Sequence, residues 1–434
     1  MNSTSSDKFY AETLDLPDDL EDFTATGLMW KAAQADARVR GISPEDYVSQ
    51  IQSGIRTFFD KDDLYNREEL LATLNETLLS KGTLTLLVGG KNVGKSNVLR
   101  SVAEEFNKAE KGPMVVQVDA RATGPDIAAG IVQAVKALEP RWHGIFRDLG
   151  RRSAGDVGAV LTYATAIPVL GNCIKSLMEY VTHEKAMTAA EAITRFVAVA
   201  EKRGRFPCLF VDEANRAFAV RNEKDKARAQ DILALLTKLT KEDKKLNVLL
   251  ASSEHAYPFR LQQNLGFNLS NVGRTVFAGE VPPAAMRELL INHWGMGKGL
   301  AEHCLAAYGG HVWHTSMAIS RLSLRKEEFA AEDMVPIGLY SGIMKCLKAE
   351  AENKGITNLL RELAVHGWAP IDDATDPSAE IFSENNVAGV VSKQSLVVGL
   401  PRTVWAKGAK YGLVPASQQV RLMIGEVLSR EGAL

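Results

Sequence analysis

The sequence has few cysteines and no strong excess of either charge. Its 434 residues include four cysteines, Cys173, Cys208, Cys304 and Cys346, which lie far apart and form no C-x-x-C pair. This spacing favours free thiols in a reducing compartment over a disulfide framework. The formal net charge of −2 gives no overall basic excess that would favour nucleic acid or an anionic membrane as partner. These absences exclude a small disulfide-rich fold and leave a composition typical of soluble globular proteins.

Targeting signals and long apolar runs are also scarce. The N-terminal stretch is polar and acidic, unlike a secretory signal or a transit peptide, so we expect an intracellular protein. One uncharged run, Val157–Ile174, is at the lower edge of the length that spans a membrane. Several polar residues and Pro168 interrupt it. We therefore predict a buried or amphipathic helical insertion here, and we do not expect a membrane partner.

The most informative segment is Thr83–Arg100. It contains Gly89-x-x-x-x-Gly94-Lys95-Ser96, the P-loop pattern, after an apolar run and before a helix-like segment. In such a turn the backbone N–H groups point at a phosphate, and the helix adds its positive dipole end. Lys95 is expected to act in catalysis by reaching the β- and γ-phosphates, and Ser96 to hold Mg²⁺. The predicted nucleotide-binding residues are Arg67, Gly89, Gly90, Lys91, Asn92, Val93, Gly94, Lys95, Ser96 and Asn97.

Two adjacent carboxylates, Asp212 and Glu213, end an apolar segment that begins at Cys208. Parallel strands present their carboxyl ends at one edge of a sheet, so these residues are expected to meet the P-loop there. Asp212 is predicted to bind Mg²⁺ together with Ser96. Glu213 is predicted to polarise the water that attacks the γ-phosphate.

Polar and basic residues near the next two predicted strands complete the expected site. Ser252 and Ser253 end one of these strands, and Ser253 is predicted to contact the γ-phosphate or the attacking water and so report hydrolysis. Glu254 and His255 follow and could contribute. Arginines neutralise the charge that develops on the γ-phosphate, and the candidates are Arg274, just before the fifth predicted strand, and Arg260.

Strands that alternate with helices predict an α/β fold. We expect a P-loop NTPase core with a three-layer parallel sheet, a helical lid and a C-terminal winged-helix-like α+β tail. The expected core strands are 84–88, 114–120, 208–213, 247–253 and 275–281. The expected domains are an N-terminal helical extension at 1–60, the core at 61–295 with a helical insertion at about 140–185, the lid at 296–365 and the tail at 366–434. Within the tail, Val387–Val391 and Ser395–Leu400 flank a polar turn and predict a hairpin.

These residues and motifs resemble the additional-strand P-loop ATPases, the AAA+ and STAND branch, and Asn66–Leu71 is similar to the entry segment of archaeal-type ATPases. A narrower resemblance, to the NTPase module of Crinkler-type effectors and retrotransposon hot spot proteins of protists, is carried by VGGKNVGKSNVLR, VQVDAR, VDEAN and GLVPASQQVRL. The resemblance implies ATP and Mg²⁺ as cofactors and an extra strand between the P-loop strand and the Asp-Glu strand. It also implies assembly into homo-oligomers in which one subunit supplies an arginine to the nucleotide site of its neighbour. Val312 departs from the family pattern, which has proline after the Gly-Gly pair.

Three functions stay open from the sequence. The chain could be an ATPase, a nucleotide-gated signalling or effector scaffold with slow turnover that binds a protein partner, or an ATP-dependent protein that binds nucleic acid through its tail. The last would use a local patch of Arg402, Lys407 and Lys410, although the tail from residue 336 has as many acidic as basic residues. The residues themselves do not distinguish ATP from GTP, and they do not fix the oligomeric state or the acting arginine.

Overall fold

The computed structural model describes residues 25–60, 64–138, 188–322, 337–351, 355–371, 376–385, 387–392, 396–397 and 411–430. The expected insertion at about 140–185, with its uncharged run, lies outside these ranges, as do Arg402, Lys407 and Lys410. Contacts divide the chain into two compact units, Met1–Asp63 with Val281–Ser341 and Leu64–Glu280 with Gly342–Leu434. The domain limits drawn from the sequence stay predictions. Within the described ranges, no helix combines the length and the apolar character needed to cross a bilayer.

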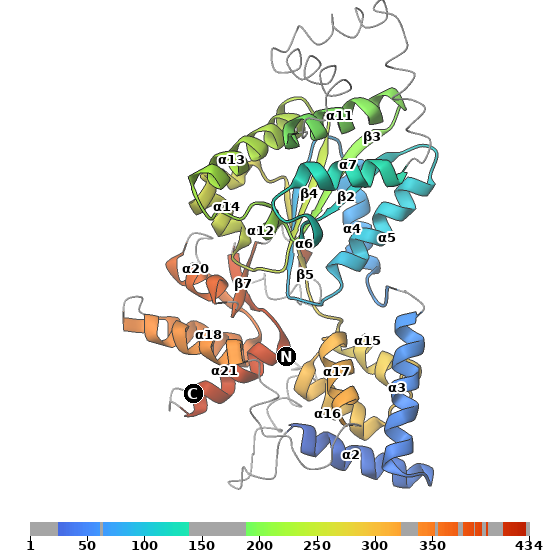
Figure 1. The fold of residues 1–434 in the computed structure, drawn as a ribbon. Coiled ribbons are helices and arrows are strands. Elements are labelled where there is room, and N and C mark those ends of the chain that lie inside the picture. The colour runs from blue at the N-terminus through green and yellow to red at the C-terminus, as the bar shows by residue number, and fades with distance from the viewer. Residues whose placement is uncertain are drawn as a thin grey trace, which may run out of the picture. The chain divides into compact units, whose positions relative to one another are not determined.

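A parallel sheet organises the second unit (Figure 1). Its strand order is β2 (Pro113–Asp119), β3 (Phe206–Asp212), β4 (Asn247–Ser252), β1 (Leu84–Gly89), β5 (Arg274–Ala278) and β8 (Leu396–Val397), and each strand pairs in parallel with the next. All five core strands predicted from the sequence are present. The order inserts β4 between β1, which leads into the P-loop, and β3, which ends at Asp212.

Helices cover both faces of this sheet because its strands are apolar on both sides. On one face, Leu84, Leu86 and Val88 of β1 pack with α7 (Ile127–Leu138), α11 (Ala189–Lys202), α13 (Glu223–Thr237) and α14 (Tyr257–Leu265). On the other face, Leu87 packs with α4 (Glu68–Leu79) and α5 (Lys95–Lys108). Successive side chains of a strand point to opposite faces, so one strand serves two cores. The predicted three-layer α/β arrangement is confirmed.

The tail is an α+β unit of the winged-helix kind. Its antiparallel sheet has the order β6 (Ala369–Ile371), β9 (Tyr411–Pro415) and β7 (Ala388–Ser392), accompanied by α19 (Ile356–His366), α20 (Pro377–Glu384) and α21 (Gln418–Arg430). The hairpin expected between 387–391 and 395–400 is wrong: β7 pairs with β9, whereas β8 pairs with β5 of the core sheet. The physical reason is that β5 has an edge whose backbone groups need partners, and β8 supplies them.

The first unit is helical. It contains α2 (Ala25–Arg40), α3 (Pro44–Asp60), α15 (Pro283–Glu288), α16 (Lys298–Tyr308) and α17 (Val312–Leu322), while α18 (Ile337–Lys348) spans the division between the units. Ser43 caps α3, since the Asp46 N–H donates to the Ser43 Oγ at 3.0 Å. Asp36 of α2 accepts hydrogen bonds from the Leu300 N–H at 3.1 Å and the Tyr47 hydroxyl at 3.3 Å. This carboxylate therefore ties α2 to α3 and to the first turn of α16.

Gly89 and Gly90 offer a matched test of the packing at the end of β1. A Cβ at Gly89 would overlap the carbonyl oxygen of Ala278 on β5, whereas a Cβ at Gly90 would lie 3.4 Å from the Ala416 oxygen. We expect Gly89→Ala to lower the free energy of unfolding by about 1–3 kcal/mol, because a paired strand cannot move aside freely. Gly90→Ala should lower it much less. Urea denaturation of the ligand-free protein measures both changes, and equal destabilisation by the two variants would contradict this close approach.

Candidate functional site

The P-loop, residues Gly89–Ser96, joins the carboxyl end of β1 to α5. Two of its residues adopt a left-handed backbone, Asn92 with φ of 60° and Gly94 with φ of 91°. Asparagine and glycine tolerate this conformation better than other residues. Gly94 is the N-cap residue of α5, and no side chain caps the helix there. The N–H groups of the first helical turn are therefore available to an anion.

Lys95 supplies a buried positive charge to this loop. Only 5% of the residue is exposed, and its Nζ donates to the carbonyl oxygens of Gly89 at 2.9 Å and Gly90 at 2.7 Å. Burial lowers the pKa of Lys95 to about 8, although the nearby carboxylates of Glu213 and Asp212 oppose the shift. The loop thus holds an ammonium group that an added anion would stabilise.

A cationic group joins Asp212 to the P-loop. Arg121 lies in the short helix α6 (Ala120–Thr123) after β2, and its Nη2 lies 3.1 Å from the Asp212 Oδ2 and 3.3 Å from the Ser96 Oγ. Its Nε also donates to the Asp119 Oδ1 at 3.0 Å. Burial acts to raise the pKa of Asp119, but the hydrogen bonds from Arg121 outweigh it and hold that pKa below its ordinary value. Ser96 and Asp212 therefore converge on one cation.

This pair of oxygen donors fits Mg²⁺. Hydroxyl and carboxylate oxygens are the hard ligands that Mg²⁺ prefers, and the ion usually keeps several waters and binds substrate phosphates as well. The side chain of Asp212 is 2% exposed and already faces a positive group. No cluster of three or more His, Cys, Asp or Glu side chains suited to a metal occurs in the described ranges. Ser96 and Asp212 would supply two of the oxygen ligands, and waters and phosphate oxygens would supply the others.

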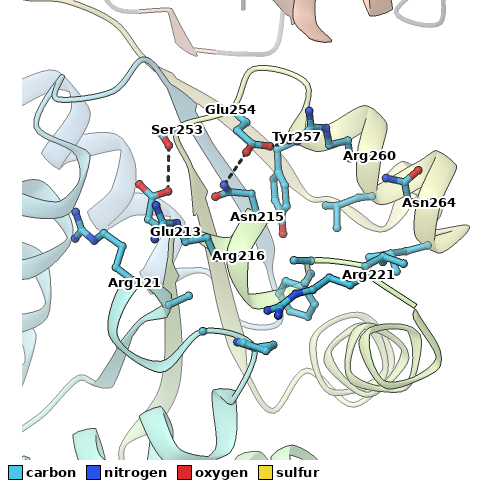
Figure 2. Close-up of a pocket in the computed structure, with 18 of the residues that line it drawn as sticks. Arg121, Glu213, Asn215, Arg216, Arg221, Ser253, Glu254, Tyr257, Arg260 and Asn264 are labelled. Atoms are coloured by element: carbon cyan, nitrogen blue, oxygen red, sulfur yellow. Dashed lines mark hydrogen bonds and ion pairs between the residues drawn. The ribbon is translucent and has the colours of Figure 1, made fainter. Parts of the chain in front are cut away.

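Glu213 is held in an uncommon backbone conformation, with φ of 54° and ψ of 48°. A non-glycine residue there costs on the order of 1 kcal/mol, and such residues cluster at functional sites. Its backbone N–H donates to the Asp212 Oδ1 at 3.0 Å, and the Ser253 Oγ donates to its Oε2 at 3.1 Å (Figure 2). Ser253 follows β4, so the neighbouring strand orients the Glu213 carboxylate.

A second group of polar residues continues from Ser253 toward α14. The Asn215 Nδ2 donates to the Glu254 Oε1 at 2.9 Å, and the Ser252 Oγ donates to the Asn215 Oδ1 at 3.3 Å. Arg260 of α14 forms an ion pair with Glu254 (Figure 2). Of the two candidate arginines, Arg260 is therefore linked through Glu254 to the residues that follow β3, and it lines the same pocket as Glu213.

Arg67 contacts the P-loop from the start of α4. Its Nη2 donates to the Val93 carbonyl at 2.6 Å and its Nη1 to the Gly279 carbonyl at 2.9 Å. Only 6% of Arg67 is exposed, and burial lowers its pKa to about 10. The guanidinium braces the loop backbone in this structure.

Arg274 is placed differently. It is the first residue of β5 and lies level with Thr85 of β1, four residues before Gly89 and so about 13 Å from the start of the loop. Its Nη1 is 3.2 Å from the Glu76 Oε2 and 3.0 Å from the Thr77 Oγ1. Within one chain the structure does not bring Arg274 together with Lys95. Arg274 lies at the amino end of β5, whereas Lys95 follows the carboxyl end of β1, and the two strands are parallel.

Two further residues bear on the site. Sequence reasoning missed Arg121 as a site residue. The available signal was its position two residues after Asp119, at the same sheet edge as the P-loop.

His255 is 3% exposed, stacks on Phe277 at 5.4 Å, and has no hydrogen-bond partner among the described residues. Burial, aided by the charge of Lys95, lowers the pKa of His255 to about 4, so it is a neutral packing group at pH 7.

Comparisons with known proteins gave structural likeness without a family. A scan against protein-family models found no match, and a search of curated proteins found none. Among solved structures, a Walker-type ATPase of Pyrococcus abyssi is 17% identical with a TM-score of 0.45, over 84% of this chain and 96% of that one. The ORC2 protein of Aeropyrum pernix, in ADPNP-ADP complexes, is 10% identical with a TM-score of 0.42, over 86% and 96%. A chain of Drosophila ORC bound to GC-rich DNA and Cdc6 is 12% identical with a TM-score of 0.35, over 80% and 48%. Because these TM-scores lie below 0.5, the function is inferred from the residues of this chain.

Lys95→Met tests the buried ammonium through the pH dependence of stability. The pKa of Lys95 falls from 10.5 to about 8 on folding. Between pH 8 and pH 10.5, Lys95 is therefore protonated to a greater extent in the unfolded chain than in the folded chain. The folded state is therefore destabilised fully below pH 8, and this penalty is relieved as the pH rises toward 10.5. We expect the free energy of unfolding of the variant, minus that of the wild type, to be larger at pH 7 than at pH 10 by about 2 kcal/mol.

Urea denaturation of both proteins without nucleotide, at pH 7 and pH 10, measures this difference. Lys108→Met is the matched control, since the Lys108 side chain is 80% exposed and its removal should give no comparable pH dependence. A Lys95→Met difference that stays constant, or that grows toward pH 10, would show that the ammonium is not destabilised by burial.

Proposed function

We propose that this chain binds ATP with Mg²⁺ at the P-loop and hydrolyses the γ-phosphate. The observation that carries the proposal is the convergence of Ser96 and Asp212 on one cationic group, with the buried ammonium of Lys95 in the same loop. A hydroxyl, a carboxylate and an ammonium in this relation match the needs of a metal-bound triphosphate. The choice of ATP over GTP rests on the sequence resemblance to the AAA+ and STAND branch, as does the narrower likeness to Crinkler-type modules.

Binding would begin with exchange of partners at Lys95. Its Nζ now donates to two loop carbonyls, and phosphate oxygens would replace these neutral acceptors with charged ones, which form stronger hydrogen bonds. Ser96 and Asp212 would hold Mg²⁺, which when bound neutralises charge on the β- and γ-phosphates. Val93 and its neighbours keep their backbone position through Arg67.

Glu213 would orient and deprotonate the attacking water. The left-handed backbone at Glu213 and the hydrogen bond from Ser253 restrict where this carboxylate can point. General-base catalysis contributes about 10²- to 10⁴-fold in rate when the base is well placed. Ser253 would report the state of the γ-phosphate through the same hydrogen bond. Arg260 is the candidate for charge neutralisation in cis, and Arg274 remains a candidate only for a neighbouring subunit of a homo-oligomer.

Glu213→Gln separates hydrolysis from binding. We expect phosphate release from Mg²⁺-ATP to fall by about 100-fold or more, because the amide cannot accept the proton, while ATP affinity changes little. Glu201→Gln is the control, since Glu201 is an exposed residue of α11. Equal, negligible phosphate release from wild type and Glu213→Gln would reject the hydrolase and favour the nucleotide-gated scaffold.

Lys95→Ala tests nucleotide binding itself. It removes charge-assisted hydrogen bonds worth about 1.5–3 kcal/mol each, so we expect the dissociation constant for Mg²⁺-ATP to rise at least about tenfold. Isothermal titration calorimetry gives this constant directly. An affinity within about twofold of the wild type would count against nucleotide binding at residues 89–96 as a whole.

A further inference from the structure

The guanidinium of Arg121 lies at the carboxyl edge of the sheet, where β2 and β3 end. Asp119 and Asp212 are register partners at the last positions of these two strands. The Nε of Arg121 lies 3.0 and 3.2 Å from the two carboxylate oxygens of Asp119, and its Nη2 lies 3.1 Å from the Asp212 Oδ2. One guanidinium therefore bridges the carboxylates that end two neighbouring strands.

This position puts Arg121 within reach of the phosphates that the P-loop would hold. Its Nη2 is 3.3 Å from the Oγ of Ser96, the second residue of α5. The first-turn N–H groups of α5 would bind phosphate oxygens, so a phosphate held there would lie near Arg121 as well. Burial lowers the pKa of Lys95, and the charge of Arg121 lowers it further. An anion that contacts both cations would relieve their repulsion.

Part of the Arg121 guanidinium is available to such an anion. Its Nη1 forms no hydrogen bond with any residue that the structure describes. The side chain is 46% exposed, and it lines a cavity of about 600 Å³ together with Glu213 (Figure 2). Because Asp119 holds the Nε edge, the two Nη atoms form the open side of the fork, and a guanidinium fork suits phosphate oxygens.

The other arginines near this edge are committed elsewhere. Arg67 is 6% exposed, and both of its Nη atoms donate to backbone carbonyls. Arg260, the candidate on the α14 side, forms its ion pair with Glu254, and within the described ranges neither a hydrogen bond nor an ion pair joins its side chain to the P-loop. Arg274 lies at the amino end of β5. Arg121 thus differs from these three by its contact with Ser96.

We propose that Arg121 is a catalytic residue that binds the γ-phosphate within its own chain and neutralises the charge that develops there during hydrolysis. This inference rests on the proposed ATPase function and adds a residue to it. In the reaction the water oxygen forms a bond to the γ-phosphorus and gives a proton to Glu213. The bond from that phosphorus to the bridging oxygen breaks, its electron pair stays on ADP, and inorganic phosphate is the second product. Arg121 would donate its Nη hydrogens to the γ-phosphoryl oxygens, while Asp119 would position the guanidinium.

Calorimetric titration of ATP and ADP at saturating Mg²⁺ tests the contact with the γ-phosphate. The full chain with Glu213→Gln is used so that ATP persists, with and without Arg121→Ala. We expect Arg121→Ala to raise the dissociation constant for ATP roughly tenfold or more, because a charge-assisted contact is lost, and that for ADP by less than about twofold. Arg100→Ala removes an exposed arginine of α5 and is the matched control, which should change either constant by less than about twofold.

Phosphate release from chains with native Glu213 tests the catalytic role. At saturating ATP we expect Arg121→Ala to lower kcat roughly 100-fold or more, since such an arginine stabilises the charge of the transition state. Arg121→Lys should recover part of this loss, because it keeps the charge without the fork. Asp119→Asn should lower kcat when Arg121 is present and have no further effect in the Arg121→Ala chain. A merely structural Asp119 would instead lower the activity of both chains.

Three outcomes would overturn the proposal. They are equal losses of ATP and ADP affinity in Arg121→Ala, a kcat of that variant within about threefold of the wild type, and loss of the preference for ATP on Arg260→Ala but not on Arg121→Ala. Circular dichroism checks that each variant is folded, and Arg121→Lys replaces Arg121→Ala in both tests if the latter is not, with the same expected directions. Absence of hydrolysis by the wild type would reject the ATPase function itself, whereas wild-type hydrolysis that Arg121→Ala leaves unchanged would reject only the role of Arg121.

Discussion

The buried ammonium group of Lys95 is the constraint on which the rest of this site depends. A charge with 5% of its residue exposed loses hydration, and the two carbonyls of the loop replace only part of it. The lowered pKa of Lys95, about 8, expresses that deficit. The carboxylates of Glu213 and Asp212 reduce the deficit from across the sheet edge, so the three charges stabilise one another. An anion that contacts Nζ would reduce this deficit further, so the loop is suited to hold a phosphate.

The position of β4 determines which groups surround this ammonium. With β4 between β1 and β3, the carboxyl ends of three adjacent strands carry the P-loop, Ser253 and the Asp212-Glu213 pair. Strands of a sheet lie about 4.8 Å apart, so a side chain on β4 can reach its neighbours on either side. The hydrogen bond from Ser253 to Glu213 uses that reach. The left-handed backbone at Glu213 then directs its carboxylate toward the same edge. The packing of the sheet offsets the free-energy cost of that conformation.

Much of this arrangement could be predicted from the sequence, because its signals are local. Apolar strands, a glycine turn and a strand-ending carboxylate pair need only their own residues to be recognised, and the five core strands and three layers followed from them. The tail was harder: β7 and β8 are neighbours in the sequence, yet they belong to different sheets, because strand pairing depends on which distant sheet edge is free. The arginines were hardest. Arg274 begins β5, whereas Arg121 follows β2, and only the strand direction tells which of them reaches the carboxyl edge of the sheet.

Arg121 occupies the place between Ser96 and Asp212 that the proposed Mg²⁺ would take. One guanidinium binds Asp119, Asp212 and Ser96. A divalent cation held by Ser96 and Asp212 would compete with this guanidinium for the same two oxygens, whereas Asp119 could keep its own contact with the Nε of Arg121. Linkage requires that competition to be reciprocal, so whatever factor the Arg121 contact imposes on the affinity for the cation, the cation imposes on the Arg121 contact. Asp119 therefore gives the displaced arginine a carboxylate partner at the same sheet edge, which lowers the free-energy cost of the exchange.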